Sequence, residues 1–155
     1  SLDEIKEVDP DILSLREFFE IVDTTKIKIY LDVKGNNIDI CSILYIFLKN
    51  QNLHNIFIAS FNIDIIHQLN KMNSKYQLGI ITDNIIPIPL LREYIEFCSP
   101  TFFSLHWQAI TEETLHFLHQ QDIIVYTFTC KNENIFSFIK DYNVDGIVTD
   151  YKIQL

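Results

Sequence analysis

Asp32 and Lys34 are the first residues of this sequence whose types and spacing could do chemistry. They lie in residues 26–35, KIKIYLDVKG, where apolar side chains alternate with polar or aromatic ones. The alternation predicts a buried strand with both charges on one face at its carboxyl end, where parallel α/β barrels hold their reactive groups. A carboxylate beside an ammonium suits a divalent cation and an anionic ligand. The alternative is a surface ion pair.

Two further candidates stand at the end of another expected strand. His106 and Trp107 close residues 101–107, TFFSLHW. His106 would lie at the carboxyl end of its strand, where barrels carry their chemistry, and could act as a catalytic histidine. The alternative is a ligand-facing or hydrogen-bonded structural histidine. Tyr126, in the strand expected at 123–129, either forms an aromatic wall with Trp107 or belongs to the core.

The remaining histidines and the cysteines give weaker signals. His116 and His119 are three residues apart on an expected helix, where they could bind a metal with a third ligand. The alternative is a solvated outer face. Cys41, Cys98 and Cys130 are widely spaced and odd in number, which suggests neither disulfides nor zinc. They are typical of reduced thiols in an intracellular, cytoplasmic protein.

Composition bounds the class of protein. With 155 residues, 48% of them hydrophobic, the chain can form one domain with a sizeable core. A net charge of -9 argues against a nucleic-acid partner, because no basic stripe is available to neutralise phosphates. No apolar run is long enough to predict a membrane span.

The patterning predicts alternating strands and helices in one domain. Short apolar strands are expected at 27–33, 56–61, 76–82, 101–107, 123–129 and 146–149, with helices between them and two more helices before the first. Six strands separated in this way predict βα units and a parallel sheet buried on both faces. A flavodoxin-like open sheet is an alternative that the same pattern permits.

Local signals support these elements. Residues 1–4 (SLDE) and 14–17 (SLRE) read as capping boxes at two helix starts. Gly79 inside a strand is expected to allow close packing in a barrel interior. Gly146 is expected to supply a backbone φ that a residue with a Cβ resists.

Several segments, taken in order, resemble the glycerophosphodiester phosphodiesterase family. They are LDVK at 31–34, SF at 60–61, YTFT at 126–129 and VDGIVTD at 144–150, preceded by an opening, 1–19, of the family's type. The resemblance covers essentially the whole chain. It implies a (β/α)₈ barrel that hydrolyses glycerophosphodiesters to an alcohol and glycerol 3-phosphate with a divalent metal.

The resemblance also implies that the chain is incomplete at its amino end. The family's two catalytic histidines lie in H-R-G and H-D motifs near its first two strands, and neither motif occurs here. The single domain over residues 1–155 is therefore expected to correspond to strands three to eight, a partial parallel TIM-type barrel of about six βα units. No catalytic residue is assigned.

The site residues that the resemblance implies are few. Asp32 takes the place of the family's metal-binding glutamate and is one methylene shorter, Lys34 stands beside the substrate phosphate, and Tyr126 replaces a tryptophan of the pocket. His106 and Trp107 join them as substrate-binding candidates because of their position. A lone carboxylate is a poor Mg²⁺ or Ca²⁺ site, so metal binding by this chain is expected to be weak or absent.

Two classes of function follow as expectations. In the first, the chain is part of a metal-dependent phosphoric diester hydrolase whose upstream segment supplies the histidines, and it is inactive alone. In the second, it is a degenerate, non-catalytic barrel that binds a phospho-ligand or interacts with proteins.

The expected missing strands also predict an assembly. A sheet of six strands leaves open edges at 27–33 and 146–149, each with unpaired backbone groups. We expect a homodimer through these edges, with residues 1–25 helping to cover the opening. The alternatives are a smaller closed barrel and cover by the chain's own helices.

Overall fold

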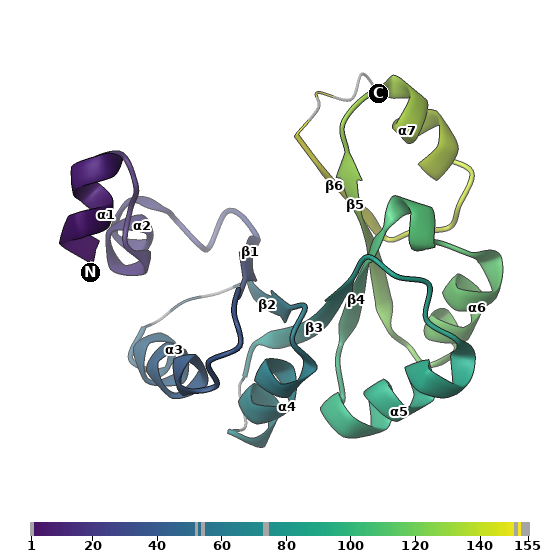
Figure 1. Ribbon diagram of the computed structural model, residues 1–155, viewed down its shortest axis with the longest axis horizontal. Helices are drawn as coiled ribbons and strands as arrows, with labels where there is room; N and C mark the ends of the chain where they lie inside the picture. The colour runs from purple at the N-terminus through teal and green to yellow at the C-terminus, as the bar shows by residue number, and fades with distance from the viewer. Residues whose placement is uncertain (1, 52, 54, 73–74, 151, 153–155) are drawn as a thin grey trace.

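The computed structural model describes residues 2–51, 53, 55–72, 75–150 and 152. Within this part, helices and strands alternate after two leading helices (Figure 1). The elements in chain order are α1 (Leu2–Val8), α2 (Leu15–Ile21), β1 (Ile29–Asp32), α3 (Asp39–Lys49), β2 (Ile56–Ser60), α4 (Ile63–Lys71), β3 (Gln77–Thr82), α5 (Ile88–Cys98), β4 (Phe102–His106), the 3₁₀ turn η1 (Trp107–Ala109), α6 (Glu112–Gln120), β5 (Ile124–Cys130), α7 (Glu133–Ile139) and β6 (Gly146–Thr149).

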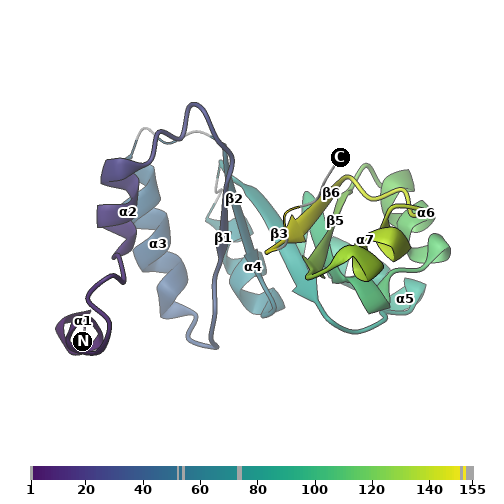
Figure 2. The same ribbon diagram turned by 90° about the horizontal axis from the view of Figure 1, so that it is seen from above.

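The sheet is parallel and follows the order of the chain. Its six strands run β1-β2-β3-β4-β5-β6, so every strand pairs with the strand before it. The sheet curls into a half-barrel, and the helices that follow β1 cover its outer face (Figures 1 and 2). The prediction of a partial parallel barrel is therefore confirmed. A flavodoxin-like sheet is excluded, because its strand order reverses at a switch point.

Caps fix several helix starts where the sequence predicts them. The Ser14 hydroxyl accepts from the Glu17 amide, and the Glu17 carboxylate accepts from the Ser14 amide, so this capping box is confirmed. Hydrogen bonds from Lys6 and from Ser14 lower the pKa of Glu17 to about 2. Asn62 caps α4 as expected. The capping box at 1–4 begins outside the described residues.

Some predicted bounds differ from the structure. The first strand starts at Ile29 rather than at 27, because its neighbour β2 begins opposite Ile29 and Ile27 is left exposed. The fourth strand ends at His106, and Trp107 opens a 3₁₀ turn instead of continuing the strand.

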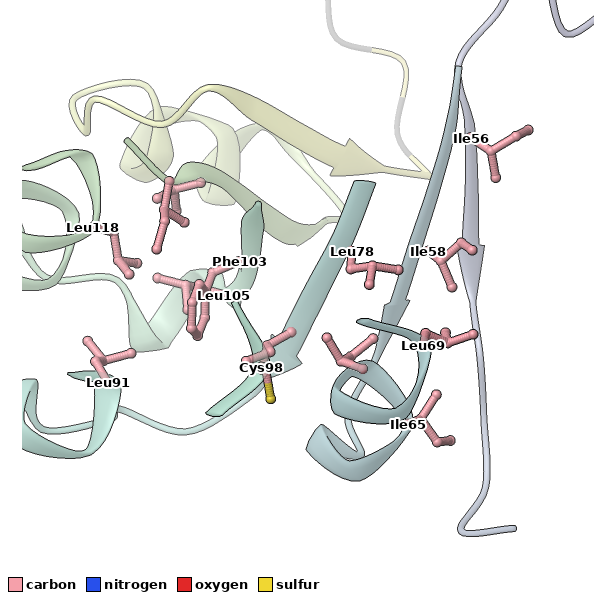
Figure 3. Packing of buried hydrophobic residues seen from close by; sticks show 14 of the residues in the cluster. Ile56, Ile58, Ile65, Leu69, Leu78, Leu91, Cys98, Phe103, Leu105 and Leu118 are labelled. Carbon is pink, nitrogen blue, oxygen red and sulfur yellow. The ribbon is translucent and has the colours of Figure 1, made fainter. Parts of the chain in front are cut away.

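The main hydrophobic core lies between the sheet and the helices. Aliphatic side chains from alternate strand positions point toward the helix layer, as Ile58, Leu78 and Leu105 show (Figure 3). They meet helix residues such as Leu69 and Leu118, which are also buried. No helix within the described residues is long and apolar enough to cross a bilayer.

A smaller core fills the inside of the curl. Phe57, Ala59, Ile81 and Phe102 are buried there, packed against half-buried residues of β5. Phe102 lies over Gly79, where an added Cβ would stand 2.1 Å from the ring. The expected close packing at this glycine is confirmed.

Gly146 serves the inner core in the same way. An added Cβ would stand 2.6 Å from the Tyr126 ring, the side chain opposite it on β5. Its φ is not positive, since Gly35 is the glycine with a left-handed φ in the described chain. The expectation of a special backbone angle at Gly146 is therefore wrong. The fold needs glycine at this position because a Cβ would clash with the Tyr126 ring.

The strands β1 and β6 are the two edges of the sheet. Helix α2 packs beside α3, with the Phe19 and Phe47 rings 6.1 Å apart, and so extends the outer layer next to β1 (Figure 2). Pairing with a second copy through the edges stays a prediction.

Candidate functional site

A cleft of about 270 Å³ opens at the carboxyl end of the half-barrel interior. Parallel barrels carry their chemistry at this end, because the loops that follow the strands converge there. Residues of both edge strands and of the strands between them line the cleft: Tyr30, Asp32, Lys34, Phe61, Ile81, Ser104, Phe128, Thr129 and Val148.

The two charged residues of this cleft form an ion pair. The Lys34 Nζ lies 2.6 Å from the Asp32 Oδ2. The same ammonium stands 4.8 Å from the centre of the Phe61 ring, a cation–π distance. The Lys34 side chain is 69% exposed and that of Asp32 33% exposed. The pair is thus placed at the rim of an interior cleft, with the ammonium open to solvent.

The backbone around Lys34 is held on both sides. The Val33 amide continues the ladder beyond β1 by donating to the Ala59 carbonyl at 2.7 Å. The Ser60 hydroxyl donates to the Val33 carbonyl at 2.7 Å and accepts from the Asn62 amide at 3.1 Å. Gly35 follows with φ +95°, a left-handed turn that glycine adopts without strain. The position of the ammonium therefore depends on the ends of β1 and β2.

A pair of hydroxyl groups lies deeper in the cleft. The Tyr30 hydroxyl and the Ser104 Oγ are 2.8 Å apart, and they join β1 to β4 across the interior. Ser104 is 1% exposed. Burial raises the pKa of Tyr30 to about 12 against the opposing effect of the Ser104 hydrogen bond. Sequence reasoning missed both residues, although Tyr30 shares the alternating face of Asp32 and could have been found by that signal.

The other predicted site residues lie outside this cleft. His106 ends β4, and its Nδ1 accepts from the Gln108 amide at 3.3 Å, which helps to start η1. Trp107 packs against the outer core, 5.7 Å from the Phe138 ring. Tyr126 belongs to the inner core. Trp107 and Tyr126 are therefore in different clusters, and they form no common aromatic wall.

Tyr126 instead faces a second cavity, at the amino end of the interior. This cavity of about 430 Å³ is lined by Lys28, Ile29, Tyr30, Phe57, Tyr126, Gly146, Ile147 and Val148. Burial raises the pKa of Tyr126, and the nearby Asp145 carboxylate adds to the effect. Tyr30 and Val148 line both cavities, and the charged residues Asp32 and Lys34 line only the one at the carboxyl end.

The two helix histidines have separate partners. The His119 Nε2 lies 3.0 Å from the Asp145 Oδ2, which also accepts from the Val125 amide at 2.7 Å. The His116 Nε2 lies 2.8 Å from the Gln120 Nε2. His116 is exposed and fits the alternative of a solvated outer face, whereas His119 is half-buried and joins α6 to Asp145, 26 residues away.

The described residues do not fit the divalent metal that the resemblance implies. Asp32 is the one carboxylate among the residues that line the cleft, and it is already paired with Lys34. No group of three or more histidine, cysteine, aspartate or glutamate residues in the described chain could hold a metal ion. Mg²⁺ and Ca²⁺ need several oxygen ligands, so no chemical step is assigned to a metal here.

Comparison with known families decides the family. The model of the glycerophosphoryl diester phosphodiesterase family matches residues 6–153. The chain belongs to this family. A comparison with curated proteins finds no match.

Solved structures of this family share the fold. A glycerophosphodiester phosphodiesterase from Thermotoga maritima superposes with a TM-score of 0.76 at 23% identity over 97% of this chain and 66% of its own. An Oleispira antarctica phosphodiesterase, solved with the product sn-glycerol-3-phosphate, gives a TM-score of 0.76 at 17% identity over 88% of this chain and 57% of its own.

A third family structure, from Parabacteroides distasonis, gives a TM-score of 0.61 at 16% identity over 78% of this chain and 51% of its own. Across these three structures, the chain spans about half to two thirds of the matched protein. These likenesses show that the curled half-barrel shares the fold of the matched part of these structures.

Proposed function

We propose that this domain binds a phosphate-bearing ligand of the glycerophosphodiester class in the carboxyl-end cleft and does not hydrolyse it alone. The observation that carries the proposal is the solvent-open Lys34 ammonium at the rim of an interior cleft. The ligand class is supported by family membership and by the Oleispira antarctica structure, which holds sn-glycerol-3-phosphate.

The Lys34 ammonium can donate a hydrogen bond to the ligand's phosphate while it keeps its present contacts with Asp32 and Phe61. An ammonium has three donors, and Asp32 takes one of them at 2.6 Å. The Phe61 ring limits where the ammonium can move. A phosphate oxygen can therefore accept from a donor that is already directed, although the Asp32 carboxylate repels the anion and keeps the affinity modest.

Hydrolysis needs groups that the described cleft does not provide. Cleaving a phosphodiester requires an acid for the leaving alkoxide and a base for the nucleophile. No histidine is among the residues that line the cleft, and His106 is tied to η1. In a longer polypeptide with the family's two histidines, the same cleft would supply the phosphate-binding part of a hydrolase site.

Calorimetric titration with glycerol 3-phosphate tests the binding. We expect Lys34→Gln to weaken the affinity about tenfold or more, since it removes a charge-assisted contact. Lys28→Gln is the matched control, because Lys28 lines the amino-end cavity and its loss changes net charge equally. Equal binding by wild type and Lys34→Gln, or no binding by wild type, would overturn the proposal.

Activity assays test the second half of the proposal. Glycerophosphocholine and bis(p-nitrophenyl) phosphate should show no turnover above background with the 155-residue chain. Turnover that persists through purification and disappears in His106→Ala would contradict the proposal and make His106 a catalytic residue.

A further inference from the structure

We propose that the hydroxyl pair of Tyr30 and Ser104 forms a hydrogen bond with a hydroxyl group of the ligand. The site then selects a polyol phosphate over a plain alkyl phosphate. This inference rests on the proposed function, because it takes the ligand's phosphate to be held at Lys34. It adds the two residues that would distinguish a glycerol group from a hydrocarbon of the same length.

Hydrogen-bond counting shows that the pair has an unused donor. When one hydroxyl donates to another, the accepting hydroxyl still has its own hydrogen to give. Among the residues that the structure describes, Tyr30 and Ser104 bond only to each other through their side chains. The Tyr30 hydroxyl keeps its proton at neutral pH, since the ordinary pKa of tyrosine is already about 10 and burial raises it to about 12.

The side chains around the pair allow this donor to distinguish a ligand hydroxyl from a methyl group. Apart from the Asp32–Lys34 ion pair and Thr129, the residues that line the cleft with the pair offer no side-chain hydrogen bonds; they are Phe61, Ile81, Phe128 and Val148. A ligand hydroxyl that reaches the pair therefore finds a specific partner, whereas a methyl group there leaves the donor unmet. At this part-buried pair, a donor left without a partner by the bound ligand lowers the affinity.

The size of the cleft suits a short ligand. Tyr30, Asp32 and Lys34 occupy successive positions on one face, about 7 Å apart along a strand. The Lys34 ammonium folds back to Asp32, within 2.6 Å of its carboxylate. The Lys34 ammonium and the hydroxyl pair line the same cleft of about 270 Å³, so a ligand with a three-carbon chain between a phosphate and a terminal hydroxyl is small enough to enter it and meet both.

The alternative is that the pair only ties β1 to β4. A tie of that kind contributes to the free energy of unfolding and to nothing else. It predicts that Tyr30→Phe and Ser104→Ala lower stability while they leave the ratio of affinities for two phosphates unchanged. Selectivity is therefore the measurement that separates the two roles.

The test compares glycerol 3-phosphate with n-propyl phosphate, which has the same carbon chain and no hydroxyl. We expect wild type to bind glycerol 3-phosphate about threefold to tenfold more tightly. Tyr30→Phe and Ser104→Ala should each bring this ratio close to one and leave the affinity for propyl phosphate unchanged. Tyr30→Phe keeps the ring that packs 5.7 Å from Phe102, so the fold should persist.

Thr127→Val is the matched control. It removes another buried hydroxyl, one that donates to the Leu105 carbonyl and does not line the cleft. This variant should keep the wild-type ratio even where its stability falls.

Each outcome bears on one proposal or on both. A wild-type ratio near one, or an unchanged ratio in both cleft variants, overturns the hydroxyl-reading role. If both phosphates still bind through Lys34, the proposed function stands. If neither phosphate binds wild type, both proposals are wrong.

Discussion

The two faces of the sheet are packed in different ways. The outer face meets the helices through a continuous core of mainly aliphatic side chains, many of them fully buried. The inner face has a core of four buried residues, flanked by aromatic rings that remain half-exposed. Phe102 and Phe103, neighbours on β4, belong to the inner and the outer core respectively. This difference indicates that stability depends mainly on the outer face, which leaves the inner face free to carry a site.

The largest effect should come from the outer face. Phe103→Ala removes a fully buried ring and should lower the free energy of unfolding by about 3–5 kcal/mol. Phe128→Ala, which removes a half-buried ring from the inner face, should lower the free energy of unfolding by less than half of that amount. Urea unfolding of both variants measures the difference. Equal losses would show that the two faces contribute alike.

Crowding the inner face should have an intermediate effect. Gly79→Ala would place a Cβ 2.1 Å from the present Phe102 ring. This crowding should lower the free energy of unfolding by about 1–3 kcal/mol. Phe102→Leu in the same chain should restore part of the loss, because the smaller side chain makes room. A double-mutant cycle by urea unfolding measures this coupling, and simple additivity would mean that the ring moves away freely.

A smaller effect should appear at alkaline pH. The pKa of Tyr30 rises from 10.0 to about 12 in the folded chain, mainly through burial. A raised folded pKa stabilises the fold fully below pH 10, and this contribution is lost as the pH rises from 10.0 to about 12. In unfolding experiments at several alkaline pH values, the free energy of unfolding should fall less steeply with pH in Tyr30→Phe than in wild type. The same slope in both would contradict the assignment.

The weakest expected effect is association. A second copy pairing at β1 or β6 would cover the half-exposed inner rings, so we expect a dimer at high micromolar concentration. Light scattering should then give an apparent mass rising from 18.3 kDa toward twice that value. A strict monomer at that concentration would count against edge pairing.

The sequence predicted the fold well because its signals are local. Apolar runs and caps such as Ser14 and Asn62 act within a few residues, and they locate the elements to within about two positions. The sequential strand order of a barrel was implied by the family resemblance, because the βα spacing alone also permits a flavodoxin-like sheet.

The site was less predictable because its contacts are distant in the chain. Tyr30 and Ser104 are 74 residues apart, and no local pattern joins them. Trp107 was misplaced by the expectation of a continued strand, since the 3₁₀ turn after His106 ends the alternation. Gly146 was misread because the Tyr126 ring that needs its space lies on another strand.

The strand order has a consequence for the sequence of events during synthesis. Each strand pairs with the strand made just before it, so the sheet and its helix layer can grow from the amino end as the chain emerges. Tyr30 cannot form its hydrogen bond to Ser104 until β4 has been synthesised. The cleft is complete only after Val148 on β6 has been synthesised. The nascent chain can therefore assemble its outer layer progressively, and the carboxyl-end cleft is completed last.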